Sequence, residues 1–308
     1  MRKNAGSIRA VRGFIFAAAL VFLSAVFAGG ADAAEGGAKK VIIASKGFAE
    51  NQIVAKLYQY ALEEKGFTVE FIDNLDNTVL WTAIEKGDID LYPEYTNTGI
   101  TNVLKLAPIY DSDEAYRVAK EKYKEKFNIV WLQPSNINNT YCLVVPKKIA
   151  DKLGLADISD VQKHAKELRA VQGGTDWTER ADHLQAMEKG YGKFEFKSRK
   201  SFDSGLKYSI LLNDQGDVTM GYTTDPQLED PNLVTLTDSR QIWPPYYLTP
   251  IIRQEKLSQY PEIENILDRV TAQLQPKAVI GLSADVVLRH EEYEDVAKDF
   301  YAKTLAGK

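Results

Sequence analysis

Two hydrophobic patterns alternate along most of the chain. Continuous apolar runs such as residues 40–45 (KVIIAS) are typical of strands that a parallel sheet buries on both faces. Longer segments such as residues 50–65 repeat their apolar residues with the period of an amphipathic helix. This alternation predicts an α/β fold in which sheets are flanked by helices. The expected strands are 40–45, 67–72, 88–92, 129–132, 142–145, 169–172, 194–197, 217–222, 234–236 and 248–252, and the expected helices are 50–65, 79–86, 112–127, 147–153, 160–168, 178–189, 202–212, 260–274, 284–289 and 291–305.

Residues 87–99 (GDIDLYPEYTNTG) combine a short buried strand with a polar, aromatic tip. We expect the strand to end at Pro93, because proline has no N–H to donate to a ladder. Tyr92 and Tyr95 then lie at the carboxyl end of a strand, where open α/β sheets bind ligands. From residue types alone, packing of both tyrosines against the domain is an equally good interpretation.

Turn residues mark the starts of two predicted helices. The helix at 178–189 follows a glycine turn (GGTDW) in which Thr175 or Asp176 can act as N-cap, and Asn77 or Thr78 can cap the helix after the second strand. A glycine turn entering a helix N-terminus is a generic anion site. It is not a P-loop, because it lacks the Gly-Lys-Ser/Thr ending.

The N-terminal residues 1–34 have the pattern of a secretory signal peptide. A basic region (Arg2, Lys3, Arg9, Arg12) precedes an apolar run at 14–28, and the small residues of Ala31-Asp32-Ala33 form a cleavage site. The apolar run is short for a membrane span, and a retained anchor is the alternative. No cysteine follows the run, which argues against a lipid-anchored lipoprotein. We therefore expect export to the periplasm, with cleavage near Ala33 or Ala34.

The charge of the chain argues against nucleic acid as a partner. The 308 residues include 38 Lys and Arg and 43 Asp and Glu, and residues 1–34 hold four of the former and one of the latter, so the mature chain carries a net charge of −8. A nucleic-acid-binding protein favours a basic stripe instead. The single cysteine, Cys142, cannot form an intramolecular disulfide, and its apolar surroundings in YCLVV predict an inert, buried thiol.

No constellation of catalytic or metal-binding residues stands out. His164, His183 and His290 are far apart in the sequence, and none has a second ligand at metal-binding spacing. The motifs G-x-S-x-G, H-E-x-x-H and G-x-G-x-x-G are not present. We therefore expect a binding protein rather than an enzyme, with no cofactor and no metal.

Tyrosine recurs at the ends of the apolar runs. Four separate segments supply Tyr92 and Tyr95, Tyr141, Tyr222, and Tyr246 and Tyr247. One such tyrosine is usually structural, but four segments with the same feature predict a shared aromatic cleft. Aromatic faces attract cations that have no N–H to donate, and quaternary ammonium is the standard case.

Six blocks resemble, in order, the osmoprotectant-binding proteins of ABC importers. The blocks are SKGFAENQ, NLDNT, GDIDLYPEYTNTG, NNTYCLVV, GYTTD and WPPYYLTPIIR, and the resemblance covers residues 39–305. The family is that of glycine betaine, choline and proline betaine receptors with an OpuAC-type domain, in its OpuBC-like branch. It implies a two-lobed, type II-like periplasmic-binding fold without catalytic activity, which delivers its ligand to a membrane permease. We expect lobe 1 at 39–142 plus 249–308 and lobe 2 at 143–248, joined by two hinge strands.

The resemblance also implies site residues. The cage for the ammonium maps onto Tyr95, Tyr141, Tyr222 and Tyr246, with Asn139 at its edge. Spacing alone favours Tyr246 over Tyr247 as the cage residue. The clamp for a ligand carboxylate maps onto Lys46, Thr98 and Arg180, a set that suits an anion because charged donors bind carboxylates strongly.

These residues predict a monomeric receptor for glycine betaine or a similar osmolyte. Choline, carnitine or another small zwitterion is the alternative ligand. An amino-acid receptor and an exported hydrolase using the same cleft are the alternatives from other classes.

Overall fold

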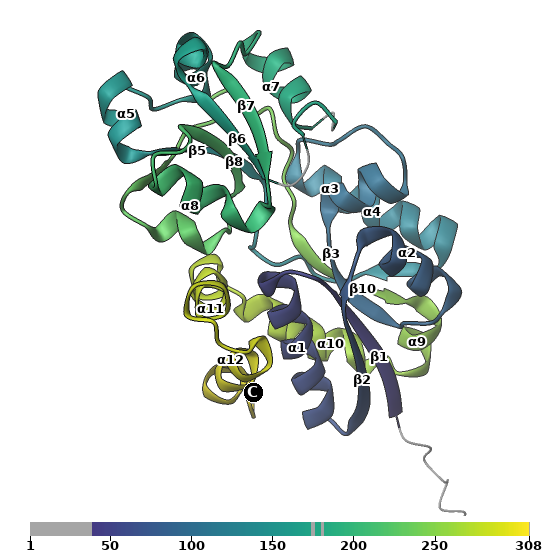
Figure 1. Ribbon diagram of the computed structural model, residues 1–308. Helices are drawn as coiled ribbons and strands as arrows, with labels where there is room; N and C mark the ends of the chain where they lie inside the picture. The colour runs from purple at the N-terminus through teal and green to yellow at the C-terminus, as the bar shows by residue number, and fades with distance from the viewer. Residues whose placement is uncertain (1–38, 174–175, 180–181, 308) are drawn as a thin grey trace, which may run out of the picture. The chain divides into compact units, whose positions relative to one another are not determined.

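The computed structural model describes residues 39–307 except 174–175 and 180–181 (Figure 1). The predicted signal peptide lies outside the described residues. One five-stranded sheet has the order β2 (Phe67–Leu75), β1 (Lys39–Lys46), β3 (Leu91–Tyr95), β10 (Leu248–Arg253) and β4 (Ile129–Trp131), and the other has the order β7 (Ser198–Phe202), β6 (Arg169–Gly173), β8 (Val218–Tyr222), β5 (Tyr141–Pro146) and β9 (Leu233–Thr235).

Both sheets are mixed. In the first sheet, β1 is parallel to β2 and β3, whereas β10 is antiparallel to β3 and β4. In the second sheet, β6 is parallel to β7 and β8, whereas β5 is antiparallel to β8 and β9. Because β10 is antiparallel to β4, the chain leaves the first sheet at the end of β4 and returns to it at the adjacent start of β10.

Helices cover both faces of the first sheet (Figure 1). Ile43 belongs to the hydrophobic cluster that α1 (Ala49–Glu64) and α10 (Glu262–Gln273) complete on one face. Its neighbour Ala44 belongs to the cluster of α2 (Asn77–Lys86) and α4 (Ser112–Phe127) on the other face. The alternation follows from the two-residue period of a strand. It explains why β1 reads as a continuous apolar run. The tail continues as α11 (Pro276–Arg289) and α12 (Tyr293–Phe300), which both pack against α1.

The second sheet is covered in the same way. Leu143 and Val145 of β5 face the cluster of α5 (Lys147–Leu153), α6 (Ile158–His164) and α7 (Leu184–Tyr191). Cys142 and Val144 face α8 (Lys207–Leu212) on the opposite side. The burial predicted for Cys142 is confirmed, and this burial raises the pKa of its thiol to about 12.

The chain crosses between the sheets twice, through residues 132–140 and 236–247. The two crossings pair with each other. Asn139 N donates to Tyr246 O at 3.0 Å, Leu248 N donates to Ile137 O at 3.0 Å, and Asn138 forms an antiparallel bridge with Tyr247. This paired ribbon is the structural counterpart of the predicted hinge strands. The lobe boundaries themselves stay a prediction.

The prediction that the strand at 88–92 ends at Pro93 is wrong. β3 runs through Pro93, which lies opposite Pro250 of β10. The flanking bonds, from Thr96 N to Tyr247 O and from Arg253 N to Asp90 O, place the two prolines at a non-hydrogen-bonded pair. A missing N–H therefore costs this ladder nothing.

Three further predictions are corrected. The apolar residues at 194–197 form a packed loop in which Phe194 and Phe196 stack, and the strand follows at the polar β7. The helix predicted at 178–189 begins at Leu184 as α7, so it does not start directly after the glycine turn, and its N-cap is His183 rather than Thr175 or Asp176. The cap of α2 is Asp76, whose carboxylate accepts from the backbone N–H groups of Thr78 and Val79.

Within the described part of the chain, no helix has the length and apolarity needed to cross a membrane. The same residues contain no group of three or more His, Cys, Asp or Glu side chains placed to hold a metal ion.

Candidate ligand-binding site

A cavity of about 660 Å³ gathers most of the predicted site residues. It is lined from the first sheet by the residues after β1 and β3, and from the second by the end of β8 and the start of α8. Seven of the eight predicted residues line it: Lys46, Tyr95, Thr98, Asn139, Tyr141, Tyr222 and Tyr246. The eighth, Arg180, lies outside the described residues.

Three of the predicted tyrosines form one cluster. Tyr141 and Tyr222 are direct cross-strand partners in the β5–β8 pair, and their ring centroids are 5.1 Å apart. Tyr246, from the second crossing, meets Tyr141 edge-to-face at 5.9 Å. Trp243 adds a fourth ring 6.0 Å from Tyr141. The register of β5 and β8 therefore brings together residues that are far apart in the sequence. Tyr222 is 40% exposed, so the cluster is accessible from the cavity.

Tyr95 approaches the cavity from the first sheet. Its ring stacks on Phe48 at 6.1 Å, and its hydroxyl donates to Glu50 Oε1 at 2.6 Å. The Asn139 amide, from the first crossing, donates to the same carboxylate oxygen at 3.0 Å. Tyr95 is thus tied to the crossing ribbon through Glu50. Tyr92 packs inside the domain, because none of its surface is exposed and it does not line the cavity.

Glu50 is a site residue that the sequence interpretation missed. It is 4% exposed and lies directly behind Tyr95 and Asn139. Burial raises the pKa of its carboxyl, and the hydrogen bonds from Tyr95 and Asn139 act in the opposite direction. The helical period contained the signal, because Glu50 shares the buried face of α1 with Ile53 and Leu57. A glutamate on the apolar face of a helix is unusual unless its charge has a partner or a function.

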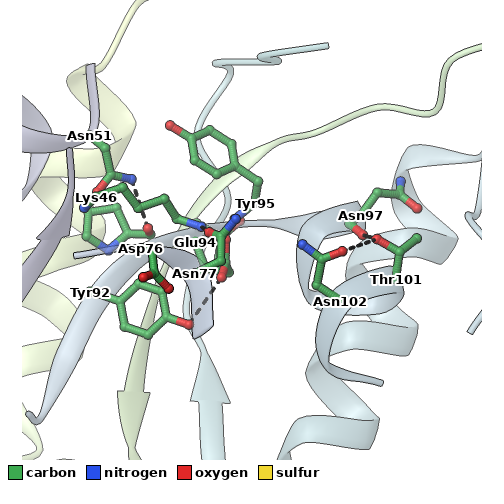
Figure 2. A network of polar contacts seen from close by, with 12 residues as sticks. Lys46, Asn51, Asp76, Asn77, Tyr92, Glu94, Tyr95, Asn97, Thr101 and Asn102 are labelled. Atoms are coloured by element: carbon green, nitrogen blue, oxygen red, sulfur yellow. Dashed lines mark hydrogen bonds and ion pairs between the residues drawn. The ribbon is translucent and has the colours of Figure 1, made fainter. Parts of the chain in front are cut away.

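Lys46 lies at the cavity with its charge already paired (Figure 2). Its ammonium contacts Glu94 Oε1 at 2.6 Å, and both side chains are less than a tenth exposed. Asn77 Oδ1 accepts a second hydrogen bond from the ammonium, and the ring of Tyr95 lies 5.5 Å away. Glu94 also accepts from the hydroxyl of Tyr92 at 3.1 Å. The strand that continues through Pro93 thereby delivers the counter-ion of Lys46.

Thr98 ends the short helix α3 (Thr96–Thr98), which continues into a π-helical turn at Gly99–Val103. Gly99 makes this turn possible. A Cβ atom at this position would lie 2.6 Å from Trp131 Cζ2 and 2.8 Å from the Tyr123 hydroxyl. The chain therefore packs closely against Trp131 and Tyr123 directly after Thr98, which lines the cavity.

A second ion pair lines the cavity from the other sheet. Lys207 Nζ lies 2.9 Å from Asp225 Oδ2, and the same oxygen accepts from the Tyr208 hydroxyl at 2.6 Å and from the Tyr222 backbone N–H at 3.0 Å. Lys207 Nζ also lies 5.2 Å from the ring centroid of Tyr222. Neither Lys207 nor Asp225 was predicted, because the type and spacing of these residues do not distinguish them from surface charges.

The described charges around the cavity favour a cation. Lys46 and Lys207 are each matched by a carboxylate, which leaves Asp76 at the rim and Glu50 behind Tyr95 in excess. Accessible aromatic rings add the negative potential of their faces.

The protein has two β-sheets flanked by helices, two crossing segments that pair with each other, and an aromatic cavity lined from both sheets. Together these features define a two-lobed substrate-binding protein. Comparison with known families gives the same class. A family described as the substrate binding domain of ABC-type glycine betaine transport systems matches residues 39–303, and the chain belongs to this OpuAC family. Its members are extracytoplasmic receptors that work with an ABC permease and are not enzymes. The predicted family, fold and class of function are therefore confirmed.

Individual relatives are similar to this chain over most of its length. The chain is 29% identical over 272 residues to a glycine-betaine-binding protein of Pseudomonas aeruginosa, covering 85% of this chain and 87% of that protein. It is 30% identical over 276 residues to the carnitine transport binding protein OpuCC of Listeria monocytogenes, covering 87% and 88%. A crystal structure described as a glycine betaine/carnitine/choline ABC transporter matches with a TM-score of 0.77 and 29% identity, covering 85% of this chain and 98% of that one.

Proposed function

We propose that this protein is a receptor for a small quaternary-ammonium osmolyte, glycine betaine or a compound close to it, which it delivers to an ABC permease. The observation that carries the proposal is the cluster of Tyr141, Tyr222 and Tyr246, which lines the same cavity as Tyr95. Tyr95 in turn donates to the buried carboxylate of Glu50. The relatives described as a glycine-betaine-binding protein and a carnitine transport binding protein support the same class of ligand.

The chemistry of the ligand fits this arrangement. A trimethylammonium group has no N–H, so hydrogen-bond acceptors cannot bind it strongly, whereas aromatic faces and a fixed negative charge can. We assign the cage to Tyr95, Tyr141, Tyr222 and Tyr246, with Asn139 at its edge. Glu50 supplies the charge through its contacts with Tyr95 and Asn139 rather than as an exposed wall.

The carboxylate end of a zwitterion requires donors. Lys46 and Thr98 line the same cavity and are proposed to contribute to this end, together with Arg180. The ammonium of Lys46 is shared with Glu94, so it acts as one member of a neutral pair and not as a full positive charge.

Binding from both sides of the cavity would drive closure of the lobes, 39–142 plus 249–308 and 143–248. A ligand that contacts both lobes binds the closed state more tightly and shifts the population toward it. The paired crossing ribbon is the hinge in this proposal. We further propose that the mature protein is a periplasmic monomer released by cleavage near Ala33 or Ala34.

A thermal-shift screen of residues 35–308 tests the proposal, because a ligand that binds the native state raises the melting temperature by mass action. Glycine betaine, choline and carnitine are compared with a set of amino acids. We expect stabilisation by trimethylammonium compounds alone. Stabilisation by amino acids alone, or turnover of a ligand in a product assay, would refute the proposal in favour of an amino-acid receptor or a hydrolase.

A further inference from the structure

The second crossing contains two consecutive prolines, Pro244 and Pro245, directly before Tyr246. A proline has no backbone N–H, so this pair can be anchored by backbone hydrogen bonds only through its carbonyl groups. The Pro244 carbonyl accepts from the hydroxyl of Thr140 in the first crossing at 2.8 Å. The side chains that bind the Pro245 carbonyl therefore help to fix the point at which the chain enters Tyr246.

Those side chains are Thr96 and Asn97 of α3, which follows β3 directly. The Pro245 carbonyl accepts from Asn97 Nδ2 at 2.7 Å and from the Thr96 hydroxyl at 3.2 Å. The same hydroxyl accepts from the Tyr247 backbone N–H at 3.1 Å, and the Thr96 backbone N–H donates to the Tyr247 carbonyl at 3.1 Å. The residues before and after Tyr246 are thus both bound to α3.

The amide of Asn97 also joins a third segment of the chain. Its nitrogen donates to the Ile109 carbonyl at 2.9 Å, and its oxygen accepts from the Ile109 backbone N–H at 2.9 Å. No surface of Asn97 is exposed, and the same holds for Thr96. Loss of a buried partner leaves polar groups unsatisfied, which is costly. Both side chains are therefore firm anchors for the second crossing.

Tyr246 carries the ring that these anchors hold. Its ring meets Tyr141 edge-to-face at 5.9 Å and lines the cavity, whereas neither Thr96 nor Asn97 does so. We infer that Thr96 and Asn97 are positioning residues that hold Tyr246 where the ligand needs it. This inference rests on the proposed function of the same cavity.

The first crossing holds Tyr246 as well, which sets the size of the expected effect. The Tyr246 backbone N–H donates to Asn138 Oδ1 at 2.7 Å, and the Tyr246 carbonyl accepts from the Asn139 N–H at 3.0 Å. Loss of the α3 anchor should therefore loosen the segment without releasing it. The apparent Kd rises by the inverse of the fraction of molecules that are competent to bind. A competent fraction of about a third to a tenth gives about threefold to tenfold weaker binding.

Thr96→Val is the cleanest perturbation, because it keeps the size of the side chain and removes only the hydroxyl. Isothermal titration calorimetry with glycine betaine compares the wild type, Thr96→Val and Thr96→Ser, each with and without Tyr246→Ala. The control Thr271→Val removes an equally buried hydroxyl of α10, which bonds to Tyr58 and to the Leu267 carbonyl.

We expect Thr96→Val to weaken glycine betaine about threefold to tenfold, Thr96→Ser to restore the affinity, and Thr271→Val to bind as the wild type does. Combined with Tyr246→Ala, Thr96→Val should cause no further loss, because a double-mutant cycle reveals residues that act through one another.

Wild-type affinity in Thr96→Val would overturn the inference, and so would the same loss with and without the Tyr246 ring, since it would indicate general loosening of the fold. Unchanged affinity in Tyr246→Ala would also overturn it and leave the proposed function intact. If the wild type bound no trimethylammonium compound, the proposed function and the inference would fail together. Melting curves without ligand show whether each variant folds, and Thr96→Ala replaces Thr96→Val if the latter does not.

Discussion

Replacing Glu50 with glutamine is expected to weaken ligand binding without lowering the stability of the ligand-free protein. The substitution keeps the size of the side chain and an acceptor oxygen for Tyr95 and Asn139, which donate to Glu50 Oε1 at 2.6 and 3.0 Å. It removes a negative charge that is buried behind the cage. A carboxylate whose ionised form is penalised by burial destabilises the ligand-free protein but favours a cationic ligand.

The expected loss of affinity follows from Coulomb's law. A cation about 5–6 Å from the Glu50 carboxylate, at an effective dielectric constant of about 20, gains about 3 kcal/mol. The pair also pays for the desolvation of both ions, so we expect a net loss of about 2 kcal/mol, roughly thirtyfold in Kd. The ligand-free variant should melt at the same temperature as the wild type or above it.

Calorimetry with glycine betaine and melting curves without ligand measure the two effects. Glu63→Gln is the control, since it makes the same change at an exposed position of the same helix.

The pH dependence of binding provides a second test. Burial raises the pKa of Glu50 above its ordinary value of 4.5. Affinity should therefore fall as the pH is lowered through this raised pKa, and this fall should be missing in Glu50→Gln.

The stability of the ligand-free protein should depend on pH in the opposite direction. Because folding raises the pKa of Glu50, the stability that its protonated form contributes is complete below the unfolded pKa and is lost as the pH rises through the folded pKa. Wild-type affinity for glycine betaine in Glu50→Gln, at any pH, would refute the role of this charge. A large drop in melting temperature would show that the carboxylate is structural.

Three further outcomes are expected. Tyr222→Ala should weaken glycine betaine by about 1–2 kcal/mol, the range for a desolvated cation–π contact, with little effect on the melting temperature because the ring is 40% exposed; unchanged affinity in calorimetry would remove Tyr222 from the cage. Gly99→Ala should destabilise the fold by about 1–3 kcal/mol in denaturant unfolding, because its Cβ would lie 2.6 Å from Trp131, whereas Gly281→Ala, with open space around its Cβ, should not. Cys142 should resist a thiol reagent at pH 8 until the protein is denatured, because burial raises its pKa to about 12; rapid labelling of the native protein would contradict its burial.

Local patterns predicted most helices and strands correctly. They failed where contacts with residues distant in the sequence determine the local structure. The predicted helices at 112–127 and 147–153 match α4 and α5. Pro93 misled the prediction, because a proline is excluded from a ladder only where its N–H is needed, and that depends on the register with β10. The apolar residues Phe194 and Phe196 resembled a strand, but they pack as a loop beside an edge strand that is almost wholly polar.

The sequence by itself determined the order of strands and helices, the family, and the tyrosines that line the cavity. Each of these depends on periodicity or on a short motif, and both are local properties of the chain. Tertiary structure decided which charges act together. Glu50 meets Asn139 across 89 positions and Lys46 meets Glu94 across 48 positions, and Lys207 shares the Asp225 carboxylate with donors from Tyr208 and Tyr222. Such pairs leave no periodic signal, because the fold brings their partners together from separate elements, and the burial that gives them their strength exists only in the folded protein.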